Sequence, residues 1–125
     1  MGYLSESALE ELNFKSLGRG VKISDKASIY DAALMDIGDF SRVDDFCILS
    51  GKVSLGRYCH VTPMCLIAGG QPGVELKDFC TLAYGVKIFA QSDDYSGETM
   101  VNSLIPRKYK RESFASVLLE RQVPP

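Results

Sequence analysis

The sequence lacks features that several classes of protein require. It has no tryptophan and one histidine among 125 residues, and its 14 lysines and arginines do not outnumber its 16 aspartates and glutamates. No run of about 18 apolar residues is present, which is the length a membrane-spanning helix needs. A nucleic-acid-binding domain needs a basic surplus. The composition therefore predicts neither a membrane span nor a nucleic-acid partner.

The first residues also lack the pattern of a secretory signal. MGYLSESALEEL carries acidic residues where such a signal has lysine or arginine followed by an apolar run. We therefore expect a cytoplasmic protein, in which the four cysteines are reduced thiols because disulfides are rare in that compartment. A chain of this length is expected to form a single domain, residues 1–125.

Residues 5–13 are predicted to form a short amphipathic helix. Ser7 and Glu10 have the spacing of a capping box. One face of the helix would carry Leu4, Ala8, Leu9 and Leu12. After Asn13 this helical period is replaced by a period of six residues.

From residue 17 onward an aliphatic residue recurs at the first position of successive hexads. These residues are Leu17, Ile23, Ile29, Ile37, Val43, Leu49, Leu55, Val61, Ile67, Leu76, Leu82 and Ile88. The fifth position is small or β-branched, as in Val21, Ala27, Ala33, Ser41, Cys47, Val53, Cys59, Cys65, Cys80 and Val86. Coils of three hexads are typical of a parallel β-helix with a triangular cross-section, whose interior takes both positions.

The departures from this period all follow the third hexad of a coil. We therefore expect the loops to leave from one edge of the prism. The predicted organisation is a helix and lead-in at 1–16, four coils at 17–88, a long loop at 89–116, and the start of a fifth coil at 117–125. The residue two places before each new coil is also expected to face inward; these residues are Met35, Val53, Val74 and Val117.

The segment LGRYCHVTPMC, residues 55–65, places two cysteines beside the only histidine. All four cysteines occupy the small inward position, where a free thiol packs as a compact apolar group. Two pairs are expected to stack in successive coils, Cys47 on Cys65 and Cys59 on Cys80. His60 takes the sixth, outward position. Because metal ligands must converge on one point, this arrangement argues against a metal site and against a cysteine–histidine nucleophile.

The hexads IGDFSR, VDDFCI, LSGKVS, LGRYCH and LKDFCT resemble those of the hexapeptide-repeat acyltransferases. The segments FKSLG, ISDKASIY, VDDFCILSG, GRYCHVTP, SDDYSGE and PRKYK are similar to the bacterial sugar acetyltransferases of polysaccharide and O-antigen assembly. This resemblance implies an all-β fold: a left-handed parallel β-helix of about four to five coils, with a short N-terminal helix and one long inserted loop. It also implies a cytoplasmic homotrimer that uses acetyl-CoA, without a metal, to acylate a sugar or nucleotide-sugar hydroxyl or amine.

The resemblance further implies roles for four residues. His60 would be the catalytic general base, because an imidazole can be both neutral near pH 7 and reachable by substrate. Asp93, Asp94 and Tyr95 would bind the sugar or orient the base from a neighbouring subunit. Structural alternatives stay open: an outward histidine can be solvated or lie at an interface, and aspartate, serine and glycine favour turns.

A non-catalytic function also stays open. Members of the family usually continue past the segment corresponding to VLLERQV with further coils that form most of the coenzyme A groove. Here Val123 is followed by Pro124 and Pro125, and proline cannot donate to a β-ladder. The alternative expectation is a truncated or diverged trimeric β-helix module whose acyl transfer is slow or absent. The acceptor sugar, the acyl group and the choice between oxygen and nitrogen are left undetermined.

Overall fold

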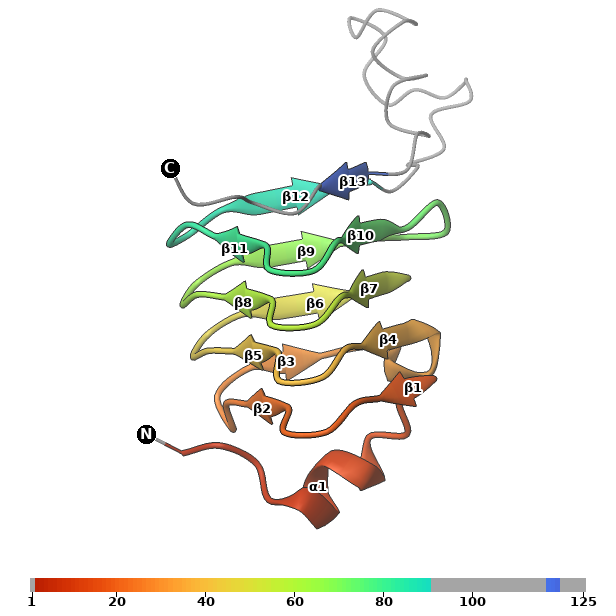
Figure 1. Ribbon diagram of the computed structural model, residues 1–125. Helices are drawn as coiled ribbons and strands as arrows, with labels where there is room; N and C mark the ends of the chain where they lie inside the picture. The colour runs from red at the N-terminus through yellow and green to blue at the C-terminus, as the bar shows by residue number, and fades with distance from the viewer. Residues whose placement is uncertain (1, 91–116, 120–125) are drawn as a thin grey trace, which may run out of the picture.

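The computed structural model describes residues 2–90 and the backbone of residues 117–119. Its strands wind into a three-sided prism in which each coil stacks on the previous one (Figure 1). Every pair of neighbouring strands is parallel. The predicted class, a parallel β-helix with one short N-terminal helix, is confirmed.

The elements follow each other in coils of three strands. After α1 (Glu6–Glu11), the first coil holds β1 (Ser16–Leu17), β2 (Lys22–Ile23) and β3 (Ser28–Ile29). The short 3-10 helix η1 (Ala32–Leu34) leads into β4 (Met35–Ile37), β5 (Arg42–Val43) and β6 (Ile48–Ser50). The third coil holds β7 (Val53–Leu55), β8 (His60–Val61) and β9 (Leu66–Ala68). The fourth holds β10 (Val74–Leu76), β11 (Thr81–Leu82) and β12 (Lys87–Phe89), and β13 (Val117–Leu119) pairs with β10.

Each side of the prism is one parallel sheet. The first wall contains β1, β4, β7, β10 and β13, the second wall β2, β5, β8 and β11, and the third wall β3, β6, β9 and β12. The extra residues before β4 and before β10 leave from the edge between the third and first walls, as the sequence predicts. Residues 91–116 of the predicted long loop lie outside the described residues. Within the described residues, no helix is long and apolar enough to cross a membrane.

The interior is filled by the residues that the hexad pattern assigns to it. The first-position residues from Ile23 to Leu82 are buried apart from Ile29, which is partly buried, as are Leu17 and Ile88 at the two ends. Met35, Val53 and Val74 are also buried, which confirms the inward role predicted for them. Full burial of such a side chain stabilises the fold by about 1.5–3 kcal/mol. The inward position predicted for Ala33 is wrong, because η1 turns this residue outward and its neighbour Ala32 is buried instead.

The N-terminal segment closes the lower end of the prism (Figure 1). The N-cap of α1 is Ser5, whose side chain accepts a hydrogen bond from the Ala8 N–H, so the predicted capping role of Ser7 is wrong. Leu9 of this helix is buried. Residues 2–4 cross β2 in the antiparallel sense, with a bridge between Tyr3 and Ser24. This crossing covers the exposed edge of the second wall.

The corners between the first and second walls carry a feature that the sequence pattern does not predict. At the fourth hexad position, Phe40, Tyr58 and Phe79 adopt left-handed backbone conformations with φ of 61°, 57° and 64°. Such a conformation costs a non-glycine residue about 1–2 kcal/mol. The rings stack into a column, with centroids 5.1 Å apart for Phe40 and Tyr58 and 5.4 Å apart for Tyr58 and Phe79. Stacking offsets part of the backbone cost.

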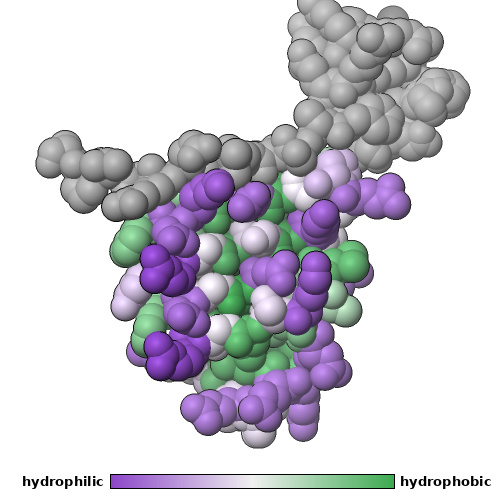
Figure 2. Space-filling model, turned by 45° about the vertical axis from the view of Figure 1, so that its right-hand side comes forward, coloured by the Kyte–Doolittle hydropathy of each residue, from purple (hydrophilic) through white to green (hydrophobic). Residues whose placement is uncertain are grey.

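Glycines allow the coils to approach closely beside the first wall. Gly18, Gly38 and Gly56 each follow a strand of this wall, and a Cβ on Gly38 would lie 2.4 Å from the carbonyl carbon and oxygen of Gly56. Figure 2 shows apolar surface between hydrophilic side chains on the face that it presents. A larger residue at Gly38 would force two coils apart.

All four cysteines face the interior as free thiols, as predicted. Backbone hydrogen bonds confirm the stacking of successive coils at these positions: the Ile48 N–H donates to Cys65 O (3.0 Å), and the His60 N–H donates to Cys80 O (2.9 Å). The Cys47 thiol donates to the Thr62 carbonyl at 3.0 Å. Burial raises the pKa of the Cys47 and Cys59 thiols, because a thiolate would lose its hydration inside the prism.

These thiols predict a loss of stability at alkaline pH. Unfolded thiols lose their protons near pH 8.5, whereas the folded thiols keep them to higher pH, so the folded state binds more protons in that window. The stabilisation is complete below about pH 8.5 and declines above it, by up to about 1.4 kcal/mol per pH unit for each thiol. Urea unfolding under reducing conditions at pH 7.5 and 9.5 measures this slope. The variants Cys47→Ala and Cys59→Ala should flatten it, and an unchanged slope would contradict the assignment.

Candidate functional site

The sixth hexad position forms a row on the outer face of the second wall. Lys22 on β2 pairs with Arg42 on β5, which pairs with His60 on β8. The next residue in the row is Thr81 on β11. Neighbouring strands lie about 4.8 Å apart, so these side chains form a continuous strip up the wall.

His60 is held by two charged neighbours. Its Nε2 lies 2.7 Å from Asp44 Oδ2 and 2.8 Å from the Arg42 guanidinium nitrogen Nη2. Arg42 also reaches Asp44, with Nε 3.2 Å from Oδ1. The His60 side chain is 30% exposed, whereas that of Asp44 is 7% exposed. The imidazole is therefore positioned by a buried carboxylate while remaining open to solvent.

The N-terminal segment covers Asp44 and explains its burial. The Tyr3 hydroxyl donates to Asp44 Oδ1 at 3.4 Å. Burial raises the pKa of Tyr3, and the nearby Asp44 carboxylate raises it further, so the phenol stays a hydrogen-bond donor. Asp44 thus receives hydrogen bonds or ion pairs from three side chains, which is what a buried carboxylate requires.

The contacts of His60 determine which ring nitrogen is available to a substrate. Nε2 either donates a proton to Asp44 or accepts one from Arg42, because a carboxylate only accepts and a guanidinium only donates. Asp44 is buried, whereas Arg42 is partly exposed and can be hydrated. The buried Asp44 carboxylate needs a hydrogen-bond donor more than the Arg42 guanidinium needs an acceptor, so we place the proton on Nε2. This tautomer leaves the Nδ1 lone pair free to act as a base.

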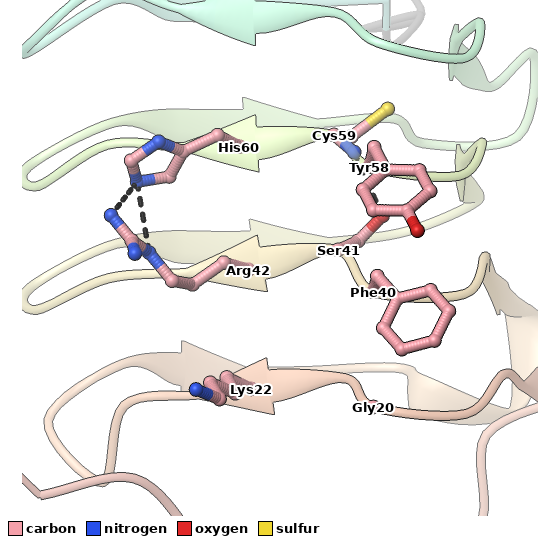
Figure 3. Close-up of a pocket in the computed structure, with 8 residues that line it drawn as sticks. All are labelled: Gly20, Lys22, Phe40, Ser41, Arg42, Tyr58, Cys59 and His60. Carbon is pink, nitrogen blue, oxygen red and sulfur yellow. Dashed lines mark hydrogen bonds between the residues drawn. The ribbon is translucent and has the colours of Figure 1, made fainter.

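A cleft of about 280 Å³ runs over these residues and the neighbouring corner. Arg42 and His60 lie on one side of it, and the rings of Phe40 and Tyr58 lie on the other (Figure 3). In the sequence a buried residue separates each ring from its polar neighbour: Ser41 lies between Phe40 and Arg42, and Cys59 lies between Tyr58 and His60. The two rings at the corner and the two polar side chains on the wall therefore line the same outer surface.

The structure tests the predicted site residues only in part. His60 points outward while the neighbouring Cys59 is buried, as the hexad register predicts. Asp93, Asp94 and Tyr95 lie outside the described residues. Among the residues that are described, no group of three histidine, cysteine, aspartate or glutamate side chains could hold a metal ion.

The sequence reasoning missed the partners of His60. Arg42 and Asp44 precede it by 18 and 16 residues, close to the length of one coil. Arg42 could have been found because it occupies the same hexad position as His60. Tyr3 carried no such signal, since it lies before the repeat begins.

Comparison with known proteins gives close matches along the chain, although no protein-family profile matches it. It is 36% identical to the dTDP-4-amino-4,6-dideoxy-D-glucose acyltransferase of Escherichia coli, covering 98% of this chain and 65% of that protein. It also matches AntD, an N-acyltransferase from Bacillus cereus solved with dTDP and 3-hydroxybutyryl-CoA (TM-score 0.82, 38% identity, 97% of this chain and 65% of that one). An AntD variant solved with dTDP-4-amino-4,6-dideoxyglucose and coenzyme A gives a TM-score of 0.81 at 39% identity, covering 96% of this chain and 64% of the variant. The chain thus spans about 65% of the length of these relatives.

Proposed function

Because the chain is a homologue, in sequence and in fold, of the left-handed β-helix, hexapeptide-repeat sugar acyltransferases, we propose that it acylates a nucleotide-linked amino sugar from a coenzyme A thioester. The observation that carries this proposal is the match over 97% of the chain to an N-acyltransferase solved with dTDP and 3-hydroxybutyryl-CoA, a variant of which was solved with dTDP-4-amino-4,6-dideoxyglucose. The reaction would take place in the cytoplasm, where the buried free thiols would stay reduced.

In this reaction His60 is the general base. Its Nδ1 takes a proton from the sugar amine as the nitrogen attacks the thioester carbonyl. The new carbon–nitrogen bond forms, the carbon–sulfur bond breaks, and the departing thiolate takes the proton back from the imidazolium. Asp44 is a positioning residue, since it keeps the other ring nitrogen protonated and fixes the orientation of the ring.

The second part of the site comes from a neighbouring subunit. β12 ends at the edge between the third and first walls, and Asp93, Asp94 and Tyr95 follow it in the sequence. His60 lies on the second wall, which is opposite that edge. We propose that Asp93, Asp94 and Tyr95 reach the sugar beside His60 from a second chain, as the family resemblance implies.

We therefore include a homotrimer in the proposal, as the family resemblance implies. The third wall and its corners support lateral association, because they expose large apolar side chains: Phe46, Ile48, Met64 and Phe89. Exposed apolar patches on this scale commonly mark protein–protein contacts. A ring of three prisms would place a second wall of one chain near the loop of the next.

The direct test is an acyl-transfer assay on the full chain. The donors are acetyl-CoA and 3-hydroxybutyryl-CoA, and the acceptors are dTDP-4-amino-4,6-dideoxyglucose and a panel of other nucleotide sugars. We expect release of coenzyme A thiol that depends on an amino-sugar acceptor. If none of the acceptors in the panel is acylated at protein concentrations where trimers form, that result would favour the non-catalytic module instead.

Mixing two inactive variants tests whether the site lies between chains. His60→Gln and Asp94→Asn would each remove one half of it. Co-refolded in equal amounts as trimers, they should recover about a quarter of the wild-type activity, because one site in four then takes an intact half from each chain. Light scattering should show three chains per particle. Absence of any recovery would show that both halves come from one chain.

A further inference from the structure

The row on the second wall places like charges on neighbouring strands. Lys22 and Arg42 are in direct register, and His60 follows Arg42. Such an arrangement is destabilising on its own. It also stands out in a chain whose net charge is −2.

The available acidic group does not neutralise the whole row. Asp44 is occupied by Arg42, His60 and Tyr3. Among the described residues Lys22 has no carboxylate partner, and its ammonium lies over the Tyr3 ring, 5.7 Å from the ring centre. The lower end of the cleft therefore carries positive charge that an anion would balance.

The other side of the cleft is aromatic. Phe40 and Tyr58 lie at the corners two residues before Arg42 and His60 and line the opposite side of the cleft. The two rings stack on each other, with an interplanar angle of 19°. Phe79 covers the other face of Tyr58, and the Arg19 guanidinium lies over the Phe40 ring. A ligand in the cleft therefore meets ring edges, and the edge of one aromatic ring on the face of another is a favourable contact.

From these observations we propose that the cleft binds the diphosphate of a nucleoside diphosphate group. Lys22 and Arg42 hold the phosphate oxygens, and the edges of Phe40 and Tyr58 contact the nucleoside. That this nucleoside diphosphate belongs to the acceptor sugar rests on the proposed function. The charged row and the ring column are independent of it.

The available donors and space fit this ligand. Lys22 can offer three N–H donors, and Arg42 retains donors beyond the Nε and Nη2 atoms that face Asp44 and His60. Hydrogen bonds between such cations and phosphate are among the stronger ones in proteins. The cleft volume of about 280 Å³ is slightly below the roughly 300–1,000 Å³ of drug-sized ligand sites. This size suits part of a nucleotide sugar, with the remainder extending along the wall.

Binding is measured by isothermal titration calorimetry with dTDP, inorganic pyrophosphate and thymidine as separate probes. The wild-type chain should bind dTDP more tightly than pyrophosphate, and thymidine most weakly. Lys22→Gln and Arg42→Gln should each weaken dTDP and pyrophosphate binding by tenfold or more. The control Lys26→Gln removes an exposed charge whose described ion-pair partner is Asp25, outside the cleft, and should leave binding unchanged. Circular dichroism checks that each variant is folded.

The outcomes separate this inference from the proposed activity. Loss of pyrophosphate and dTDP binding in folded Lys22→Gln supports the diphosphate site even if no acyl transfer is found. Acyl transfer with a KM for the nucleotide sugar that Lys22→Gln leaves unchanged would overturn the site while preserving the function. Equal binding of dTDP by the wild-type chain and both cleft variants, or no binding at all, would also overturn it.

Discussion

Replacing Gly38 by alanine is expected to destabilise the protein by about 3 kcal/mol or more. The new methyl carbon would lie 2.4 Å from both the carbonyl carbon and the oxygen of Gly56 in the next coil. This obstacle is backbone, which cannot rotate away as a side chain can. The coils must separate, and separation breaks contacts on all three walls. The free energy of unfolding from urea titration provides the measurement.

Gly85 offers a matched control for the same substitution. Its φ is +74°, and an added Cβ would have no atom within 4 Å. Gly85→Ala therefore meets only the cost of a left-handed backbone, about 1–2 kcal/mol, whereas Gly38→Ala meets a collision. Equal losses for the two variants would mean that the coils are less closely stacked at Gly38 than the structure shows.

The second large effect concerns the proposed base. His60→Gln should lower kcat by about 10²–10⁴-fold, the usual contribution of general base catalysis, with little change in KM. Glutamine keeps a polar group that Asp44 and Arg42 can contact, so the fold should be retained. The exposed residue Glu75 on the first wall provides the control variant Glu75→Gln, which should keep full activity.

The same measurement separates the role of Asp44 from that of His60. Asp44→Asn leaves the imidazole in place but replaces one carboxylate oxygen by an amide NH2, which can donate to Nε2 and favour the tautomer with the proton on Nδ1. We therefore expect kcat to fall while substrate binding persists. One other result would assign the general base to a different residue. If His60→Gln retains activity while Asp93→Asn or Asp94→Asn loses it, the proton is taken by a carboxylate of the loop and His60 is structural.

The period of six residues was sufficient to predict the interior of the prism. Inward positions depend only on local alternation and on how many residues turn each corner, so Cys47, Cys59 and Val61 could be placed without knowledge of any other coil. Ala33 failed because an insertion adopted its own 3-10 geometry. The N-cap was also misplaced, since Ser5 and Ser7 are chemically equivalent in the sequence and only the path of the chain decides between them.

The outer surface was harder to predict because its contacts join different coils. The Arg42–Asp44–His60 cluster depends on the exact stacking register and on side-chain rotamers. The column of Phe40, Tyr58 and Phe79 depends on a left-handed corner that non-glycine residues rarely adopt. In both cases the sequence contained the residues at regular positions, but their physical role required the distance between neighbouring coils.

Residues 2–4 run antiparallel to the chain at β2 and so block one end of the prism against the stacking of another molecule. A stack of parallel coils ends in unpaired strands, and the end of one molecule could in principle template the start of another, producing a fibre. Here the segment of residues 2–4 lies beside the first coil and runs in the opposite direction. The hydrogen bond from the Leu4 N–H to the Ile23 carbonyl uses an acceptor that an added coil would need. Molecules can therefore meet side by side but not end on end at this pole, which keeps assembly finite.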